Sequence, residues 1–179
     1  LNYRESESGQ VLQEGISEAG AIASWIASAT SYSNAGSPTL PFYTFYSMFG
    51  FQRVGDQIWA ASDARYRGFL MAATAGPTTL NREGLQAQDG YSLLHARTVH
   101  YCRAWDAAEA YELAKIIRNG IEEMWGRDMD VFHYVMLYNQ NEQQPAKPEA
   151  VDEGIIKGAY QLSKAGKGKQ PIVRLLGSG

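Results

Sequence analysis

Two glutamates stand four residues apart in the segment EGISEAG, residues 14–20, just before a run of apolar residues at helical spacing. The helix is expected to carry the second one, Glu18, into the core together with Ile16. A buried carboxyl without a partner takes up a proton, so we expect a raised pKa for Glu18 and proton exchange with a ligand nitrogen. The alternative is that Glu18 only caps the backbone N–H groups of the helix start.

A second feature is the polar segment PTTLNREGLQAQDGYS, residues 77–92, which lies between two hydrophobic stretches. It is too polar for a buried strand, and its glycines interrupt any helix. Loops on a rigid scaffold often carry binding residues. The segment is therefore predicted to be a ligand-binding loop.

Apolar periodicity along the chain alternates between helical and extended patterns. Ser17 and Asp106 are placed to cap two of the expected helices. Helices are predicted at residues 17–30, 51–68, 106–126 and 149–166, and strands at residues 40–49, 68–76, 98–106, 131–141 and 171–176. This alternation predicts a three-layer α/β fold, with a mainly parallel sheet, helices on both faces, and ligands beyond the carboxyl ends of the strands.

Composition limits the classes of function. The chain has 179 residues, 45% of them hydrophobic, and a net charge of −3. It lacks the basic excess of nucleic-acid-binding proteins, and no apolar run reaches the roughly 18 residues of a membrane helix. The single Cys102 cannot form an internal disulfide, so a cytoplasmic location is expected.

Common catalytic and metal-binding motifs are absent from the sequence, including HExxH, CxxC, the P-loop and GxGxxG. The three histidines do not group, and His100 and His133 fall in predicted strands, where packed or edge positions are expected. We therefore expect no metal ligand from this chain.

Four segments, taken in chain order, resemble the pyrimidine-binding domain of the homodimeric-type pyruvate dehydrogenase E1 component. That component is a thiamin diphosphate enzyme of the transketolase-like superfamily. The segments are EGISEAG, PFYTFYSMFGFQRVGDQIWAASDARYRGF, TAGPTTLNREGLQAQDG and DVFHYVMLYNQNE. The similarity spans residues 3–179 and implies a thiamin diphosphate-binding fold of the pyrimidine type over residues 1–165. Residues 166–179 would then be a linker and the start of a transketolase C-terminal-like domain.

The resemblance implies roles for five residues. Glu18 would hydrogen-bond N1′ of the cofactor's aminopyrimidine and favour the imino tautomer, whose nitrogen removes the C2 proton of the thiazolium. Ile16 would lie beside this glutamate, and Phe49 would stack on the pyrimidine. Tyr46 and Arg53 would approach the cofactor or its bound intermediate. Without the resemblance, Tyr46 and Phe49 would be interpreted as aromatic core.

The polar loop departs from the family pattern. Where the family carries histidines that contact the substrate, this chain has Ala87 and Tyr91, and Pro77 and Arg82 replace an arginine and a glycine. Most other loop positions match. The resemblance implies a substrate-side loop that includes Glu83, Gln86, Ala87, Asp89 and Tyr91. Changes confined to reacting positions favour altered substrate choice, with decay of the site as the alternative.

The motif that holds the diphosphate and Mg²⁺, a Gly-Asp-Gly followed by an Asn, is missing. In the family it belongs to a separate domain. The chain also begins without Met and closes on IVRLLGSG, so both ends are expected to be cuts in a longer chain. We expect a split, hetero-oligomeric enzyme with a partner subunit, or a fragment of a longer chain. In either case this chain would be inactive alone and would need a subunit or domain that supplies the Mg²⁺ ligands.

The favoured hypothesis is the pyrimidine-binding half of a thiamin diphosphate-dependent, E1-like or transketolase-like enzyme. It would form a two-carbon C2-adduct from a 2-oxo acid or ketose phosphate. It would then transfer the unit as an acyl group to a lipoyl domain or an acyl carrier protein, in a specialised biosynthetic pathway. The alternatives are a noncatalytic structural or regulatory partner of an E1-type assembly, and a generic α/β binding domain. Retention of Glu18 with Phe49 favours the enzyme.

Overall fold

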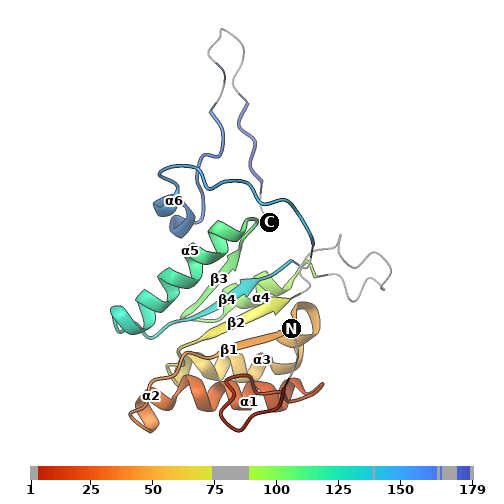
Figure 1. Cartoon of the computed structure of the whole chain (residues 1–179), viewed down its shortest axis with the longest axis vertical. Coiled ribbons are helices and arrows are strands. Elements are labelled where there is room, and N and C mark those ends of the chain that lie inside the picture. The colour runs from red at the N-terminus through yellow and green to blue at the C-terminus, as the bar shows by residue number, and fades with distance from the viewer. Residues whose placement is uncertain (1–3, 74–88, 139, 165, 167–172, 178–179) are drawn as a thin grey trace.

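The centre of the molecule is a sheet of four parallel strands in the order β1-β2-β4-β3. The computed structural model describes residues 4–73, 89–138, 140–164, 166 and 173–177. The strands are β1 Phe42–Tyr46, β2 Phe69–Ala73, β3 Cys102–Asp106 and β4 Phe132–Met136. Helices lie on both sides of the sheet (Figure 1). The predicted three-layer α/β fold with a parallel sheet is confirmed.

The two central strands are buried on both faces. Every residue of β4 is buried, and in β2 only Ala73 is partly exposed. Their sequences, FLMAA and FHYVM, are continuous apolar runs apart from one histidine. Strands covered on both faces lack the alternation of half-exposed strands. This burial explains why the apolar runs at residues 68–76 and 131–141 predict strands. β4 ends at Met136, short of the predicted end at 141, and residues 74–76 lie outside the described part.

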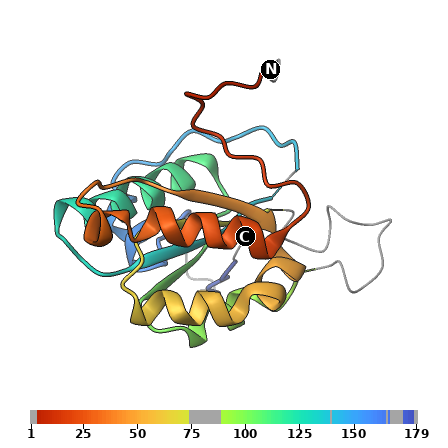
Figure 2. The same cartoon turned by 90° about the horizontal axis from the view of Figure 1, so that it is seen from below.

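One helical layer packs through a core that includes Ile22, Trp25, Val54 and Ile58. The layer consists of α1 Glu18–Ala29, the short α2 Ser31–Asn34, α3 Ser47–Asp63 and α4 Ser92–Thr98. Figure 2 shows α1 and α3 lying side by side, and they are in contact. The Ser17 side chain accepts a hydrogen bond from the Gly20 N–H at 3.2 Å, which confirms Ser17 as the cap of α1.

The other layer consists of α5 Ala110–Ile121, the π-helical turn η2 Glu122–Gly126 and α6 Asp152–Lys157. Ile116 and Gly120 are the buried residues of α5, followed by Met124 in η2. A Cβ at Gly120 would lie 2.8 Å from the Phe69 ring and 2.9 Å from His133 Nε2. Glycine is therefore required where α5 crosses the sheet.

The predicted strands at 40–49 and 98–106 are each wrong at one end, where a helix takes the place of part of the strand. The predicted strand at 40–49 ends at Tyr46, and Ser47 to Phe49 begin α3. The predicted strand at 98–106 begins only at Cys102, after helix α4. His100, expected in that strand, lies exposed in a turn, whereas His133 is fully buried in β4 as predicted.

Helix ends also differ from the predictions. Asp106 ends β3 and does not cap α5. The Glu112 carboxylate instead accepts the N–H groups of Ala108 and Glu109, at 2.8 and 3.1 Å. The helix predicted at 149–166 spans only α6, because Gly158 adopts φ 85° and ends it. Residues 173–176 of the predicted strand 171–176 are not in a strand, and residues 171–172 lie outside the described part. Within the described residues no helix has the length and apolar character to cross a membrane.

A buried polar pair, Glu123 and His133, joins η2 to β4. The indole N–H of Trp105 donates to His133 Nδ1 at 3.0 Å, so the proton of neutral His133 is on Nε2. His133 Nε2 lies 3.3 Å from Glu123 Oε2, and the two buried atoms face each other without the geometry of a hydrogen bond. Interaction with His133, helped by Arg103 and Arg127, lowers the pKa of Glu123.

Replacing Glu123 with glutamine is expected to reduce the free energy of unfolding at pH 7 by about 1–3 kcal/mol. The reason is that Arg103 and Arg127 lose the buried carboxylate with which they pair. The folded pKa lies below the ordinary value of 4.5, so this stabilisation is complete above pH 4.5 and is lost as pH falls through the folded value. Urea unfolding at pH 7 and pH 4 measures both effects. The control is Glu153→Gln, at an exposed pair with Lys157. Equal losses in the two variants would contradict the prediction.

Candidate functional site

The candidate site lies at the carboxyl end of β1, the edge of a parallel sheet where ligands generally bind. Glu18 is the first residue of α1, and Arg53 belongs to α3. Arg53 Nη1 donates a hydrogen bond to Glu18 Oε1 and forms an ion pair with it. The side chains of Glu18 and Arg53 are 20% and 54% exposed. Two residues 35 positions apart in sequence therefore meet at an accessible edge.

An aromatic wall stands beside this ion pair. The rings of Tyr46 and Phe49 stack with centroids 5.4 Å apart and planes inclined by 19°. Arg53 lies one helical turn after Phe49, and its guanidinium carbon is 5.2 Å from the Phe49 ring centroid. Both aromatic residues are partly exposed. The interpretation of Tyr46 and Phe49 as aromatic core, made from the residues alone, is therefore wrong.

The charge state of Glu18 differs from the prediction. Its pKa is lowered, first by a hydrogen bond with its own backbone N–H and then by Arg53, against the opposing effect of burial. The expected raised pKa is wrong because α1 places Glu18 at its surface end, beside a cation, and outside the apolar core. The lowered pKa favours the ionised carboxylate, which accepts the hydrogen bond from Arg53.

The residues just before α1 are exposed. Ile16 is 100% exposed, so its expected place on the buried face of the helix is wrong. It lies outside α1, which begins at Glu18 after the Ser17 cap. The Glu14 carboxylate accepts a hydrogen bond from the Ser24 hydroxyl. Glu18 is the glutamate of EGISEAG that forms the ion pair with Arg53.

Only two residues of the predicted substrate-side loop can be placed. Pro77, Arg82, Glu83, Gln86 and Ala87 lie outside the described residues. Asp89 is 3% exposed, and its carboxylate accepts hydrogen bonds from residues at the start of α4. Tyr91 is 60% exposed. Of the two predicted loop residues that the structure describes, Asp89 is therefore buried and Tyr91 is exposed.

Sequence reasoning missed a second polar contact at this edge of the sheet. The Tyr138 hydroxyl, just after β4, donates to Asp106 Oδ1 at the end of β3, at 2.7 Å. Burial raises the pKa of Tyr138. Only the position of both residues at the ends of adjacent strands could have indicated this contact.

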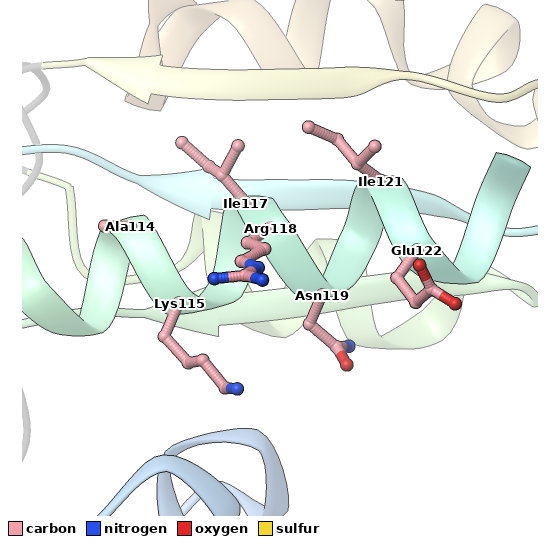
Figure 3. A pocket seen from close by; sticks show the side chains of 7 residues that line it. All are labelled: Ala114, Lys115, Ile117, Arg118, Asn119, Ile121 and Glu122. Atoms are coloured by element: carbon pink, nitrogen blue, oxygen red, sulfur yellow. The ribbon is translucent and has the colours of Figure 1, made fainter. Parts of the chain in front are cut away.

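A surface hollow of about 750 Å³ lies elsewhere, along α5 and the start of η2. Figure 3 shows Lys115 and Asn119 pointing towards α6, and Ile117 and Ile121 pointing away from it. None of the predicted site residues lines the hollow. Within the described part of the chain, no group of three or more His, Cys, Asp or Glu is placed to hold a metal ion. The Glu18 site remains the candidate.

Comparison with solved structures supports the fold. The chain is similar to transketolase from Campylobacter jejuni, with a TM-score of 0.55 and 15% identity over 68% of this chain and 18% of that one. A transketolase mutant from Pichia stipitis gives a TM-score of 0.57 and 19% identity over 70% and 17% of the two chains. At these identities the likeness shows the fold alone.

Sequence comparison identifies the family. The chain is 56% identical over 177 residues to the pyruvate dehydrogenase E1 component of Pseudomonas aeruginosa, and 52% identical over 178 residues to that of Escherichia coli. Each match covers 99% of this chain, which spans about 20% of the length of either relative. The family model described as the pyruvate dehydrogenase E1 component middle domain matches residues 1–145. The chain belongs to the family of pyruvate dehydrogenase E1 middle domains.

Proposed function

We propose that this chain supplies the pyrimidine-binding half of the thiamin diphosphate site in a pyruvate dehydrogenase E1-type enzyme. The observation that carries the proposal is the Glu18 carboxylate paired with Arg53, whose guanidinium lies over the Phe49 ring of the Tyr46–Phe49 stack, at the carboxyl edge of the sheet. The 56% identity to a pyruvate dehydrogenase E1 component supports this enzyme class.

The side chains at this edge fit an aminopyrimidine. A flat heteroaromatic ring can pack against the Phe49 face while a ring nitrogen meets the Glu18 carboxylate. Glu18 retains exposed surface, and the preceding Ile16 offers apolar contact area beside it. When bound, thiamin diphosphate supplies the carbon nucleophile and the electron sink for cleavage of a bond next to a carbonyl.

Glu18 has the central role in the proposed mechanism. As an ionised carboxylate it accepts a hydrogen bond from the protonated ring nitrogen and holds the proton at that atom. Arg53 is its present partner and must share or release it for the ring to bind. Because Arg53 is more than half exposed, its guanidinium can turn towards an anionic group of the donor.

The remaining half of the site must come from elsewhere in the enzyme. We propose that another domain or subunit binds the diphosphate through Mg²⁺, and that this chain is inactive without it. Residues 1–165 would form the pyrimidine-binding domain, and residues 166–179 would lead into the next domain. We place the assembly in the cytoplasm, within a specialised biosynthetic pathway.

We propose pyruvate, another 2-oxo acid or a ketose phosphate as the two-carbon donor. The acceptor would be the thiol of a lipoyl domain or acyl carrier protein. Ala87 and Tyr91, which stand where the resemblance implies histidines, are proposed to set the choice of donor. The same replacements are the specific feature that favours a second candidate, a noncatalytic structural or regulatory partner of an E1-type assembly.

Co-expression with a partner that carries the diphosphate-binding motif tests the proposal. We expect the assembly to bind thiamin diphosphate with Mg²⁺ in calorimetric titration, and to turn over either pyruvate or a ketose phosphate. Cofactor binding without turnover of any two-carbon donor would favour the noncatalytic candidate. An assembly that does not bind the cofactor would contradict the proposed function.

Replacing Ala87 with histidine tests the loop in the same assembly. A histidine at this position is expected to increase pyruvate turnover, because imidazole can donate or accept a proton at neutral pH and a methyl group cannot. Steady-state rates with pyruvate, compared with those of Ala87→Gln, measure the gain. Equal rates in the two variants would show that Ala87 does not determine substrate choice.

A further inference from the structure

Arg53 makes the two contacts that a flat cationic ligand would make at the candidate site. Its Nη1 donates a hydrogen bond to Glu18 Oε1 and forms an ion pair with that carboxylate. Its guanidinium carbon lies over the Phe49 ring, 5.2 Å from the ring centroid. Paired aromatic rings have centroids about 4.5–7 Å apart, so the guanidinium takes the place of a stacked heteroaromatic ring. One side chain of the protein therefore uses both contacts.

A guanidinium and a protonated aminopyrimidine share the properties that these contacts recognise. The Arg53 guanidinium is planar, delocalised and positively charged, with N–H donors at its edge. A protonated aminopyrimidine is also a flat cation with N–H donors at its edge. The carboxylate of Glu18 attracts either group through a charge-assisted hydrogen bond, and the Phe49 face attracts either through its ring electrons. The two groups cannot use Glu18 Oε1 and the same region of the Phe49 ring together.

The backbone around Arg53 is anchored, whereas its side chain is accessible. Val54 is fully buried and has the non-helical angles φ −126° and ψ 20°, so α3 is kinked directly after Arg53. Beyond the kink, Ile58 and Ala61 are also fully buried. The Arg53 side chain, in contrast, is 54% exposed. Its guanidinium can therefore leave Glu18 and Phe49 by side-chain rotation, without movement of the core.

The strength of these contacts allows them to open. An ion pair with an exposed partner is screened by solvent, and a cation–π contact at an exposed site is similarly weak. Together they are expected to favour the closed arrangement about five- to tenfold. A ligand that binds only the open arrangement loses apparent affinity by the same factor.

We propose that Arg53 is an internal competitor for the pyrimidine site, which keeps Glu18 and Phe49 occupied until the aminopyrimidine of the cofactor displaces it. The proposal rests on the proposed function and deepens it by adding regulation of the same site. Competition keeps the Glu18 carboxylate paired between binding events and reduces cofactor affinity. Displacement also frees the guanidinium when the ring binds, so that it becomes available to the anionic group of the donor.

Calorimetric titration of the complete E1 enzyme that contains this domain, with Mg²⁺ in excess, tests the proposal. Arg53→Met keeps an unbranched side chain but removes the charge, and is expected to lower Kd for thiamin diphosphate about five- to tenfold. Arg53→Lys keeps the charge but loses the planar stacking, so an intermediate Kd is expected. Because salt screens the exposed pair, the ratio of the wild-type Kd to that of Arg53→Met should fall as sodium chloride is added.

Arg65→Met is the matched control, because Arg65 is also an arginine paired with a carboxylate. It follows α3 by two residues, its side chain is 73% exposed, and its Nη1 lies 3.6 Å from Asp130 Oδ2. Its replacement is expected to leave Kd for the cofactor unchanged. Melting curves of the cofactor-free variants show whether they fold.

A Kd for Arg53→Met equal to or above the wild-type value would overturn the proposal. If that variant does not fold, the Kd of Arg53→Lys decides in the same way. If the wild-type enzyme binds the cofactor and depends on Glu18, but loss of the Arg53 guanidinium does not tighten binding, only this inference fails. If neither the wild type nor the variants bind thiamin diphosphate, the proposed function fails as well.

Discussion

Replacing Glu18 with glutamine is expected to lower kcat of the complete enzyme by about 100- to 10,000-fold, the usual contribution of a general acid or base. The amide keeps the size and hydrogen-bonding capacity of the carboxylate but cannot hold a proton at the ring nitrogen. Thiamin diphosphate affinity should change less than kcat, because the Phe49 face remains. Steady-state kinetics and cofactor titration measure the two quantities.

Glu14→Gln is the matched control for this prediction. Glu14 stands four residues before Glu18, and its carboxylate accepts a hydrogen bond from the Ser24 hydroxyl. Its replacement is expected to leave kcat within about twofold, as is usual for surface substitutions away from a site. Equal kcat in Glu18→Gln and the wild type would show that the acid/base assignment is wrong.

Replacing Gly50 with alanine is expected to reduce the free energy of unfolding by about 3 kcal/mol or more, the upper range for overpacking. A Cβ at this position would overlap the ring of Phe45, which is 6% exposed between α3 and the sheet. Either the ring or the helix must move. Because α3 carries Phe49 and Arg53, we expect loss of cofactor affinity to accompany loss of stability. Urea unfolding followed by circular dichroism measures the stability.

The same helix provides the control for Gly50. A Cβ at Gly55 meets no atom within 4 Å, so Gly55→Ala is expected to stabilise the chain by up to about 1 kcal/mol through helix propensity. Reducing the ring in the double variant Gly50→Ala/Phe45→Leu should restore part of the lost stability. Similar effects of Gly50→Ala and Gly55→Ala would refute the steric explanation.

For Glu18, the correct part of the prediction came from neighbouring residues, and the wrong part concerned a contact made by tertiary packing. Helical spacing correctly indicated that Glu18 lies at the entrance to α1, and Ser17 caps that helix as expected. Spacing could not indicate Arg53, which approaches only after α3 has packed against α1. The opposite charge reverses the direction of the pKa expected from burial alone.

The environments of Tyr46, Phe49 and the polar loop also could not be predicted from neighbouring residues. Local composition favours a strand through residues 40–49, yet the chain turns into α3 at Ser47 and leaves Tyr46 and Phe49 at the edge of the sheet. In the loop, the resemblance placed Asp89 and Tyr91 together on the substrate side. In the structure Asp89 is buried, with its carboxylate accepting the Tyr91 N–H, whereas the Tyr91 side chain is exposed.

The sequence by itself determined the α/β class, the parallel sheet, the cap of α1 and the family, because periodicity, capping and ordered motifs are encoded by neighbouring residues. The tertiary structure decided the charge state of Glu18, the exposure of Tyr46 and Phe49, and the separate environments of Asp89 and Tyr91. Each of these depends on where distant segments meet once the helices pack on the sheet. Burial, ion pairing and access to ligand arise from that packing, which local patterns do not encode.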